Sequence, residues 1–226
     1  NKVAYLDGCF AVVYKDDTPY LINKDFETFS LAKYDYIIPD FSDYLVVSVG
    51  SGDNEKFGFI KNNGEEIIKP SYDYATNFVE NKAIVTLDDK TMVINPKNEI
   101  LFTFPNNMFS ASTYSEDMLV VEYEGKYTYL DDSFKKQNVS FDYAGSFVNG
   151  YAVVGNIIDG AMKYGLIDKS MNLIIDIKFD FLDNYYDGYL RCATAINAKN
   201  NEYAYSFINL KGNYLKNNGN VLTYDF

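Results

Sequence analysis

The sequence predicts an all-β protein: a solenoid-like tandem array of about six three-stranded units, each about 37 residues long. Three observations favour it. Aromatic residues that suit strands are abundant, with 22 Tyr and 17 Phe. Short sequence blocks recur in a fixed order at nearly constant spacing. No stretch shows the sustained periodicity of an amphipathic helix. With 47% hydrophobic residues among 226, the chain can bury a substantial core.

The first block, an aromatic residue, any residue, an aliphatic residue and Ile, predicts a strand followed by a turn. In "FGFIKNN", Phe57 and Phe59 share one face of a strand, and the Asn-Asn-Gly sequence after it accepts the positive φ of a hairpin turn. The fourth residue of the block recurs at spacings of 38, 34, 36, 37 and 41 residues, at Ile22, Ile60, Ile94, Leu130, Ile167 and Ile208.

The second block is a return strand followed by an aromatic-Asp pair. "EEIIK" predicts the return strand, and Pro70 ends it because proline cannot continue the ladder. A pair that recurs in several copies is typical of scaffold, with the ring in the core and the Asp capping a turn. The functional alternative is a ring and a carboxylate that bind a sugar or a cation. The pairs are Tyr34-Asp35, Tyr72-Asp73, Phe141-Asp142 and Phe179-Asp180.

The third block, an aromatic residue and a turn before an aliphatic stretch, predicts the third strand, as in "FVENKAIVTL" from Phe78. The three blocks make one repeat domain over residues 1–226. Partial copies at both ends leave open a closed six-bladed β-propeller, in which residues 5–13 pair with residues 205–222 to complete one blade. The approximate copies are 1–15 (partial), 16–53, 54–88, 89–124, 125–161, 162–201 and 202–226 (partial).

The order of these blocks resembles the bacterial WG repeat family. The resemblance is clearest in "KFGFIKNNGEEIIKPSYDYATNFVENKAIV" from Lys56 and "KYGLIDKSMNLIIDIKFDFLDNYYDGYL" from Lys163. The family pattern begins Trp-Gly, and this chain keeps the Gly only at Gly58 and Gly165. The resemblance implies an interaction module, often in secreted or cell-envelope proteins, with no general enzymatic activity. The family Trp is replaced throughout, by Pro19, Phe57, Thr91, Tyr127, Tyr164 and Tyr205.

Charge and composition exclude several classes of function. The net charge of -12 repels phosphate backbones, and no Lys/Arg cluster is present, so no nucleic-acid partner is expected. No apolar run is long enough for a membrane helix. The chain has no His, the commonest general base and zinc ligand. Cys9 and Cys192 are expected to be free thiols because they lie on opposite strand faces and, in an open array, several repeats apart.

No catalytic residue, metal ligand or cofactor is predicted, and the binding residues are left open. The carboxylate-rich stretches are interpreted as solvated hairpin turns, although paired carboxylates also serve glycoside hydrolysis. They are Asp16-Asp17, Asp53-x-Glu55, Asp88-Asp89, Asp131-Asp132 and Asp183 to Asp187. Residues that depart from the repeat pattern mark either sequence drift in a tolerant scaffold or a binding patch. The departing residues are Pro19, Tyr20, Thr91, Met92 and Thr128.

The favoured function is a non-enzymatic interaction protein that presents an acidic, Tyr-rich β surface to a protein or a cell-wall glycan. One alternative is a carbohydrate-active enzyme that uses a non-repeated carboxylate pair. Another is a structural spacer within a larger surface protein. We expect the protein to be secreted or at the surface of a bacterium, with a cytoplasmic location as the alternative.

Overall fold

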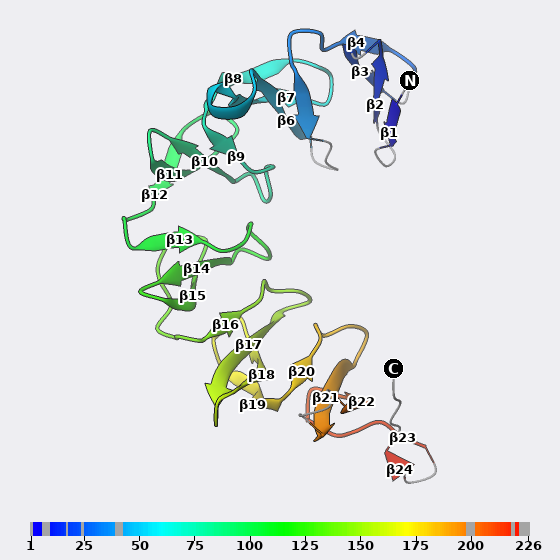
Figure 1. The fold of residues 1–226 in the computed structure, drawn as a ribbon, viewed down its shortest axis with the longest axis vertical. Coiled ribbons are helices and arrows are strands. Elements are labelled where there is room, and N and C mark those ends of the chain that lie inside the picture. The colour runs from blue at the N-terminus through cyan, green and yellow to red at the C-terminus, as the bar shows by residue number, and fades with distance from the viewer. Residues whose placement is uncertain are drawn as a thin grey trace. The chain divides into compact units, whose positions relative to one another are not determined.

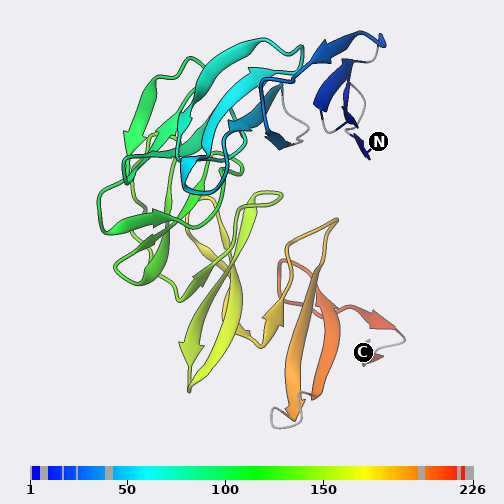
Figure 2. The ribbon, with the colours of Figure 1, turned by 45° about the horizontal axis from the view of Figure 1, so that its top comes forward.

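The computed structural model describes residues 2–5, 10–16, 18–23, 25–38, 43–197, 202–217 and 220–221. Over this part of the chain the structure consists of strands, turns and one short 3-10 helix, without an α-helix. The strands form separate small antiparallel sheets, which confirms the predicted all-β class (Figures 1 and 2). None of the described residues form a helix suited to crossing a membrane. The chain divides into two compact units, Asn1–Asn106 and Asn107–Phe226.

The first unit contains three four-stranded sheets, each with its strands in chain order. The 3-10 helix η1 (Gly52–Asn54) lies in the loop between the second and third strands of the middle sheet. The first sheet is β1 (Lys2–Tyr5), β2 (Phe10–Lys15), β3 (Thr18–Asn23) and β4 (Thr28–Ser30); the second is β5 (Tyr36–Ile38), β6 (Tyr44–Val49), β7 (Lys56–Lys61) and β8 (Glu66–Tyr72); the third is β9 (Tyr74–Ala75), β10 (Ala83–Leu87), β11 (Lys90–Ile94) and β12 (Ile100–Thr103).

The second unit contains sheets of three, four, three and two strands among its described residues. They are β13 (Met108–Ser110), β14 (Leu119–Tyr123) and β15 (Lys126–Leu130); β16 (Tyr143–Ala144), β17 (Tyr151–Ile158), β18 (Ala161–Asp168) and β19 (Leu173–Phe179); β20 (Phe181–Leu182), β21 (Leu190–Asn197) and β22 (Glu202–Ile208); and β23 (Lys216–Asn217) with β24 (Asn220–Val221).

In three of the four-stranded sheets, those that begin with β5, β9 and β16, one strand is short and was not predicted by the block pattern. This strand follows the aromatic-Asp pair directly and is two or three residues long, as in β9 at Tyr74–Ala75. It pairs with the strand of the third block, through Ala75 opposite Val85 in the β9–β10 pair. So short a segment has no periodicity of its own, which is why the sequence predicted three strands per unit.

The sheets also begin and end at different places from the predicted copies. The third-block strand of one copy pairs with the first-block strand of the next, as β10 pairs with β11. A tight turn joins them, and its residues Asp88 and Asp89 have φ of 49° and 62°, as a two-residue hairpin turn requires. Four of the described sheets, those that begin with β5, β9, β16 and β20, therefore start just after an aromatic-Asp pair. The predicted pairing of residues 5–13 with 205–222 involves residues outside the described ones and stays a prediction.

Within each unit, neighbouring sheets bury opposite faces of the same strand. On β6, Leu45 and Val47 belong to the core shared with the first sheet, whereas Val46 belongs to the core shared with the third. On β17, Val153 faces one neighbouring sheet while Ala152 and Val154 face the other. Burial on both faces explains why the third-block strands are continuous apolar runs rather than alternating ones.

The polar residue after the conserved Ile closes the turn between the first strand and the return strand. The Oδ1 atom of Asp168 accepts hydrogen bonds from the amides of Ser170 and Asn172, at 2.9 and 2.8 Å. Asn95, Asp131 and Asn209 make the same pair of bonds in their own turns. The Asn/Asp preference at this position is therefore structural.

The two retained glycines permit a close approach between strands. A Cβ atom on Gly58 would lie 2.5 Å from the Ile68 carbonyl oxygen and 2.5 Å from the Pro70 nitrogen. A Cβ atom on Gly165 would lie 2.5 Å from the Ile175 carbonyl oxygen. Both glycines face the long return strands β8 and β19, which are seven residues each. Strand β8 continues through Pro70 to Tyr72, so the prediction that Pro70 ends the return strand is wrong. The Gly of the repeat is therefore needed where the return strand runs its full length along the first.

Candidate functional site

The aromatic-Asp pairs are part of the scaffold. Their rings are 3 to 8% exposed and belong to the cores between sheets. The Asp73 carboxylate accepts a hydrogen bond from the Asp88 amide at 2.9 Å and also binds the Lys56 ammonium. Lys56 begins a strand of one sheet, and Asp88 closes a hairpin of the next. The carboxylate thus ties consecutive sheets together.

Asp142 repeats this arrangement in the second unit. It binds the Lys126 ammonium and accepts a hydrogen bond from the Ile157 amide at 2.9 Å. These interactions lower the pKa of the Asp142 carboxyl below its usual value, the lysine contributing most. Asp180 binds Lys163 in the same way. The structural interpretation of the pairs is therefore confirmed for these copies. The signal that sequence reasoning missed is the lysine just before the first block in each of them, Lys56, Lys126 and Lys163.

The other sequence candidates also have structural roles. Thr128 is buried, and its hydroxyl donates to the Gln137 carbonyl at 3.1 Å. Met92 is buried in the core between two sheets, and the hydroxyls of Thr91 and Thr86 lie 3.3 Å apart. Pro19 is buried and Tyr20 half-buried on β3. None of these five lines the pocket described below.

Several of the carboxylates that the sequence singled out lie at hairpin turns in the part of the chain that the structure describes. Asp88 and Asp89 form a hairpin turn, and Asp131 caps one. No group of three or more Cys, Asp or Glu in the described segments could hold a metal ion. Cys192 is a free thiol, buried between strands, and burial raises its pKa to about 11. Cys9 lies outside the described residues.

A series of exposed aromatic residues follows the Asp position on the edge strand of successive sheets. Tyr36 and Tyr74 are each 53% exposed, Phe109 is 60% exposed, Tyr143 is 41% exposed, and Phe181 is half-buried. They lie on β5, β9, β13, β16 and β20, the first strand of each sheet. In the sequence, four of these residues are the third residue of "YDY", "FDY" or "FDF", one position beyond the pair that was singled out, whereas Phe109 follows Met108 in the copy that lacks the pair.

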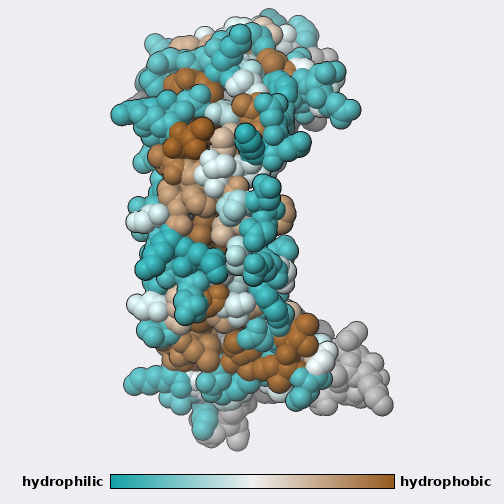
Figure 3. Space-filling model, turned by 90° about the vertical axis from the view of Figure 1, so that its left-hand side faces the viewer, coloured by the Kyte–Doolittle hydropathy of each residue, from teal (hydrophilic) through white to brown (hydrophobic). Residues whose placement is uncertain are grey.

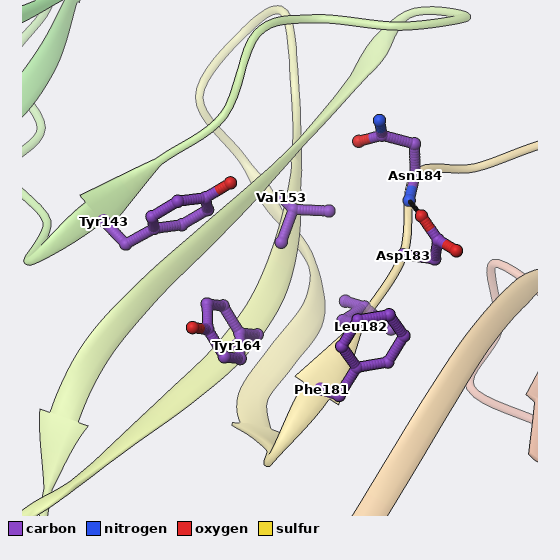
Figure 4. A pocket seen from close by; sticks show the side chains of 7 residues that line it. All are labelled: Tyr143, Val153, Tyr164, Phe181, Leu182, Asp183 and Asn184. Atoms are coloured by element: carbon purple, nitrogen blue, oxygen red, sulfur yellow. Dashed lines mark hydrogen bonds between the residues drawn. The ribbon is translucent and has the colours of Figure 1, made fainter. Parts of the chain in front are cut away.

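A pocket of about 260 Å³ lies in the second unit, between the sheet of β16–β19 and strand β20. Two members of the aromatic series contribute to it (Figure 4). The rings of Tyr143 and Tyr164 are nearly perpendicular, at 84°, with centroids 5.5 Å apart. Figure 4 shows these two rings on one side of the space and Phe181 on the other. The full lining is Tyr143, Val153, Tyr164, Phe181, Leu182, Asp183 and Asn184.

The polar side of this pocket is formed by Asp183 and Asn184. The Asp183 carboxylate forms a salt bridge with Arg191 at 3.0 Å and accepts the Asn184 amide at 3.0 Å. The Arg191 guanidinium also lies over the Phe181 ring, 5.1 Å from its centroid. Burial raises the pKa of the Tyr143 hydroxyl, with a smaller contribution from Tyr164. The Asp183 carboxylate and the Arg191 guanidinium thus hold each other in place, and their opposite charges cancel.

This arrangement suits binding better than hydrolysis. Apolar rings with a few oriented polar groups are typical of ligand sites. Glycoside hydrolysis uses a pair of carboxylates on either side of the bond, and the lining of this pocket supplies one, Asp183. Outside the pocket, hydrophobic residues on the face in Figure 3 gather in separate patches among hydrophilic ones.

Comparison with solved structures shows similarity of fold. A crystal structure of a eukaryotic initiation factor matches with a TM-score of 0.61 at 9% identity, covering 100% of this chain and 65% of that chain. This chain therefore spans less than two thirds of that protein's length. The Kluyveromyces lactis Hsv2p structure has a TM-score of 0.46 at 9% identity, covering 92% of this chain and 74% of that chain. The Neurospora crassa Pan2 WD40 domain has a TM-score of 0.40 at 12% identity, covering 94% of this chain and 87% of that chain. The last two scores are too low to support any argument.

Comparison by sequence identifies the repeat. No curated protein matches the chain. The model of the WG containing repeat matches residues 57–90 and 164–192. These segments hold the two retained glycines, Gly58 and Gly165, which are also the positions where the return strand lies closest. The remaining copies have lost the Gly, and their return strands are shorter or irregular. Residues 57–90 and 164–192 therefore match the WG-type β repeat, which confirms the resemblance for these two segments.

Proposed function

We propose that this chain is a non-catalytic binding protein that presents its exposed edge-strand aromatic residues to a protein or a glycan of a bacterial cell envelope, from a secreted or surface location. The observation that carries the proposal is the recurrence of an aromatic ring at one repeat position in five of the described sheets, exposed in four of them and half-buried in the fifth. Single exposed apolar residues are ordinary on protein surfaces, but a periodic series is not expected from chance. Tyr is favoured at interfaces because it combines a large apolar area with a polar tip.

The experiment is a co-sedimentation assay of the purified full chain with bacterial cell envelopes. The double variant Tyr36→Ser/Tyr74→Ser should reduce the bound fraction. The matched control is Ile100→Ser/Leu173→Ser, two residues that are 59% and 50% exposed at another position of the repeat. Digesting the envelopes with a protease beforehand separates the two partner classes, because only a glycan survives.

The expected result is retention that depends on Tyr36 and Tyr74 and not on Ile100 and Leu173, with no glycan fragments released. If the chain fails to sediment with either envelope preparation, it is not a binding protein for this surface. Equal losses in both double variants would show that general hydrophobicity, rather than the aromatic series, causes retention. Release of soluble sugars would favour the enzymatic alternative.

A further inference from the structure

We propose that the pocket bounded by Tyr143, Tyr164, Phe181, Asp183 and Asn184 is a subsite for one neutral sugar ring of a glycan chain. This inference rests on the proposed function and specifies the chemical class of the partner. The pocket is built within a single compact unit, from strands β16, β17, β18 and β20 and the segment that follows β20.

The shape of the pocket matches the two kinds of surface on a sugar ring. A pyranose has apolar C–H faces and hydroxyls around its rim. The perpendicular rings of Tyr143 and Tyr164 and the ring of Phe181 offer apolar walls, over a floor that includes Val153 (Figure 4). Asp183 and Asn184 lie together at one side and offer hydrogen-bonding groups for the hydroxyls.

The local charge decides between a sugar and a cation. Aromatic rings beside a carboxylate can also hold an ammonium group. Here the Asp183 carboxylate is already paired with Arg191 at 3.0 Å, and the guanidinium lies over the Phe181 ring. A second cation would meet the positive charge of Arg191 and a neutralised acid. A neutral ligand keeps the ion pair and gains the ring contacts, so it is favoured despite the acidic net charge of the chain.

The charged pair is found in one of the four described sheets that share the same backbone hydrogen bond; in one of the others, Ala111 donates its amide to the Val120 carbonyl at 3.0 Å. Asp183 donates its amide to the Arg191 carbonyl at 2.8 Å. At the same repeat position Thr76 donates to Ile84 at 2.9 Å, and Gly145 donates to Val153 at 2.8 Å. Arg191 is also the single arginine of the sequence. The aromatic half of the pocket is thus common to the repeat, whereas its polar half is particular to this copy.

The size of the pocket limits what it holds. Its volume of about 260 Å³ is below the roughly 300–1,000 Å³ of sites that enclose drug-sized ligands. One ring therefore fits, with the rest of the glycan extending over the surface. A single small subsite gives weak binding, with a Kd on the order of 1 mM.

The test is a titration of the ¹⁵N-labelled full chain with chitotetraose, cellotetraose and tetramethylammonium chloride, followed by amide chemical shifts. We expect a neutral saccharide to shift the Asn184 amide. Phe181→Ala and Asp183→Ala should each weaken binding about tenfold, from the loss of a ring contact or of the oriented carboxylate. Leu173→Ala is the matched control, because Leu173 lies in the same unit, is 50% exposed and does not line the pocket, and it should leave the affinity unchanged.

Three results would overturn the subsite: no saccharide shifts the Asn184 amide, tetramethylammonium binds there more tightly than the saccharides, or Leu173→Ala weakens binding as much as Phe181→Ala. Thermal unfolding of each variant verifies its fold, and Phe181→Leu replaces Phe181→Ala if that variant unfolds. Envelope retention of Phe181→Ala is measured in parallel. If the envelopes retain it while oligosaccharide binding is absent in the wild type, the subsite fails and the proposed function stands.

Discussion

Replacing Gly58 with Ala tests how closely the return strand β8 approaches β7. The new Cβ atom would lie 2.5 Å from the Ile68 carbonyl oxygen, 2.5 Å from the Pro70 nitrogen and 2.8 Å from the Lys69 carbonyl carbon. Favourable contacts of this kind lie at about 3.5–4.0 Å. All three opposing atoms are backbone, so no side chain can rotate away. Relief requires β8 to move by roughly 1 Å, the difference between these contact distances.

The cost follows from that movement. Overpacking in a well-packed region costs about 1–3 kcal/mol. The shift also weakens one or two hydrogen bonds of the β7–β8 ladder, each worth about 0.5–1.5 kcal/mol. Against this, Ala stabilises by about 0.4–1 kcal/mol through the unfolded chain. We therefore expect Gly58→Ala to lower the free energy of unfolding of the first unit by about 2–4 kcal/mol.

The assay is urea unfolding of the full chain, followed by circular dichroism and fitted with separate transitions for two units. The control is Gly145→Ala, whose Cβ atom meets the Val153 carbonyl oxygen at 3.3 Å. A movement of the neighbouring strand by a few tenths of an ångström relieves that contact, so the change in the free energy of unfolding should stay within about 1 kcal/mol. An unchanged urea midpoint for Gly58→Ala would refute the close approach and, with it, this explanation of the retained glycine.

Two further predictions concern titratable groups. The pKa of the Asp142 carboxyl is lowered, so its contribution to stability is present above about pH 4, the usual range of an aspartate, and is lost as pH falls through the folded-state pKa. The melting temperature of Asp142→Asn should therefore fall less on acidification than that of the wild type or of Asp53→Asn, and equal acid sensitivity would contradict the role of the Lys126 link. Because Cys192 is buried with a raised pKa, its thiol in a Cys9→Ser background should react with a disulfide reagent slowly when folded and fully in denaturant; rapid reaction of the folded protein would show that this strand is accessible.

Much of the scaffold could be predicted because it is repeated. A recurring pair such as Tyr72-Asp73 was expected to place a ring in the core and an acid at a turn, and it does. The short strand at Tyr74–Ala75 could not be predicted from pattern, since its pairing with β10 is set by the sheet and not by local sequence. The Lys56 link was also missed, because a lysine before a strand carries no signal until its partner is known.

The pocket was harder to predict for a different reason. Tyr143, Tyr164 and Phe181 are separated in sequence and meet because two sheets pack together. Asp183 was noted within a carboxylate-rich stretch, but its pairing with Arg191 depends on which residues face each other across β20 and β21. The position of a residue within the repeat therefore predicts the aromatic residues of the pocket, whereas the Asp183–Arg191 pair depends on tertiary packing.

The sheet boundaries have a consequence for how this chain can change in length. A repeating sequence shows the length of one copy but not where a copy begins, so any starting point looks equivalent when copies are aligned. The folded chain shows where its units begin, because four of the described sheets start just after an aromatic-Asp pair such as Tyr72-Asp73. A segment gained or lost between two such points adds or removes a whole sheet with its hairpins intact. The same segment taken from the middle of a hairpin leaves two unpaired halves, so whole-repeat duplications are expected to join at these positions.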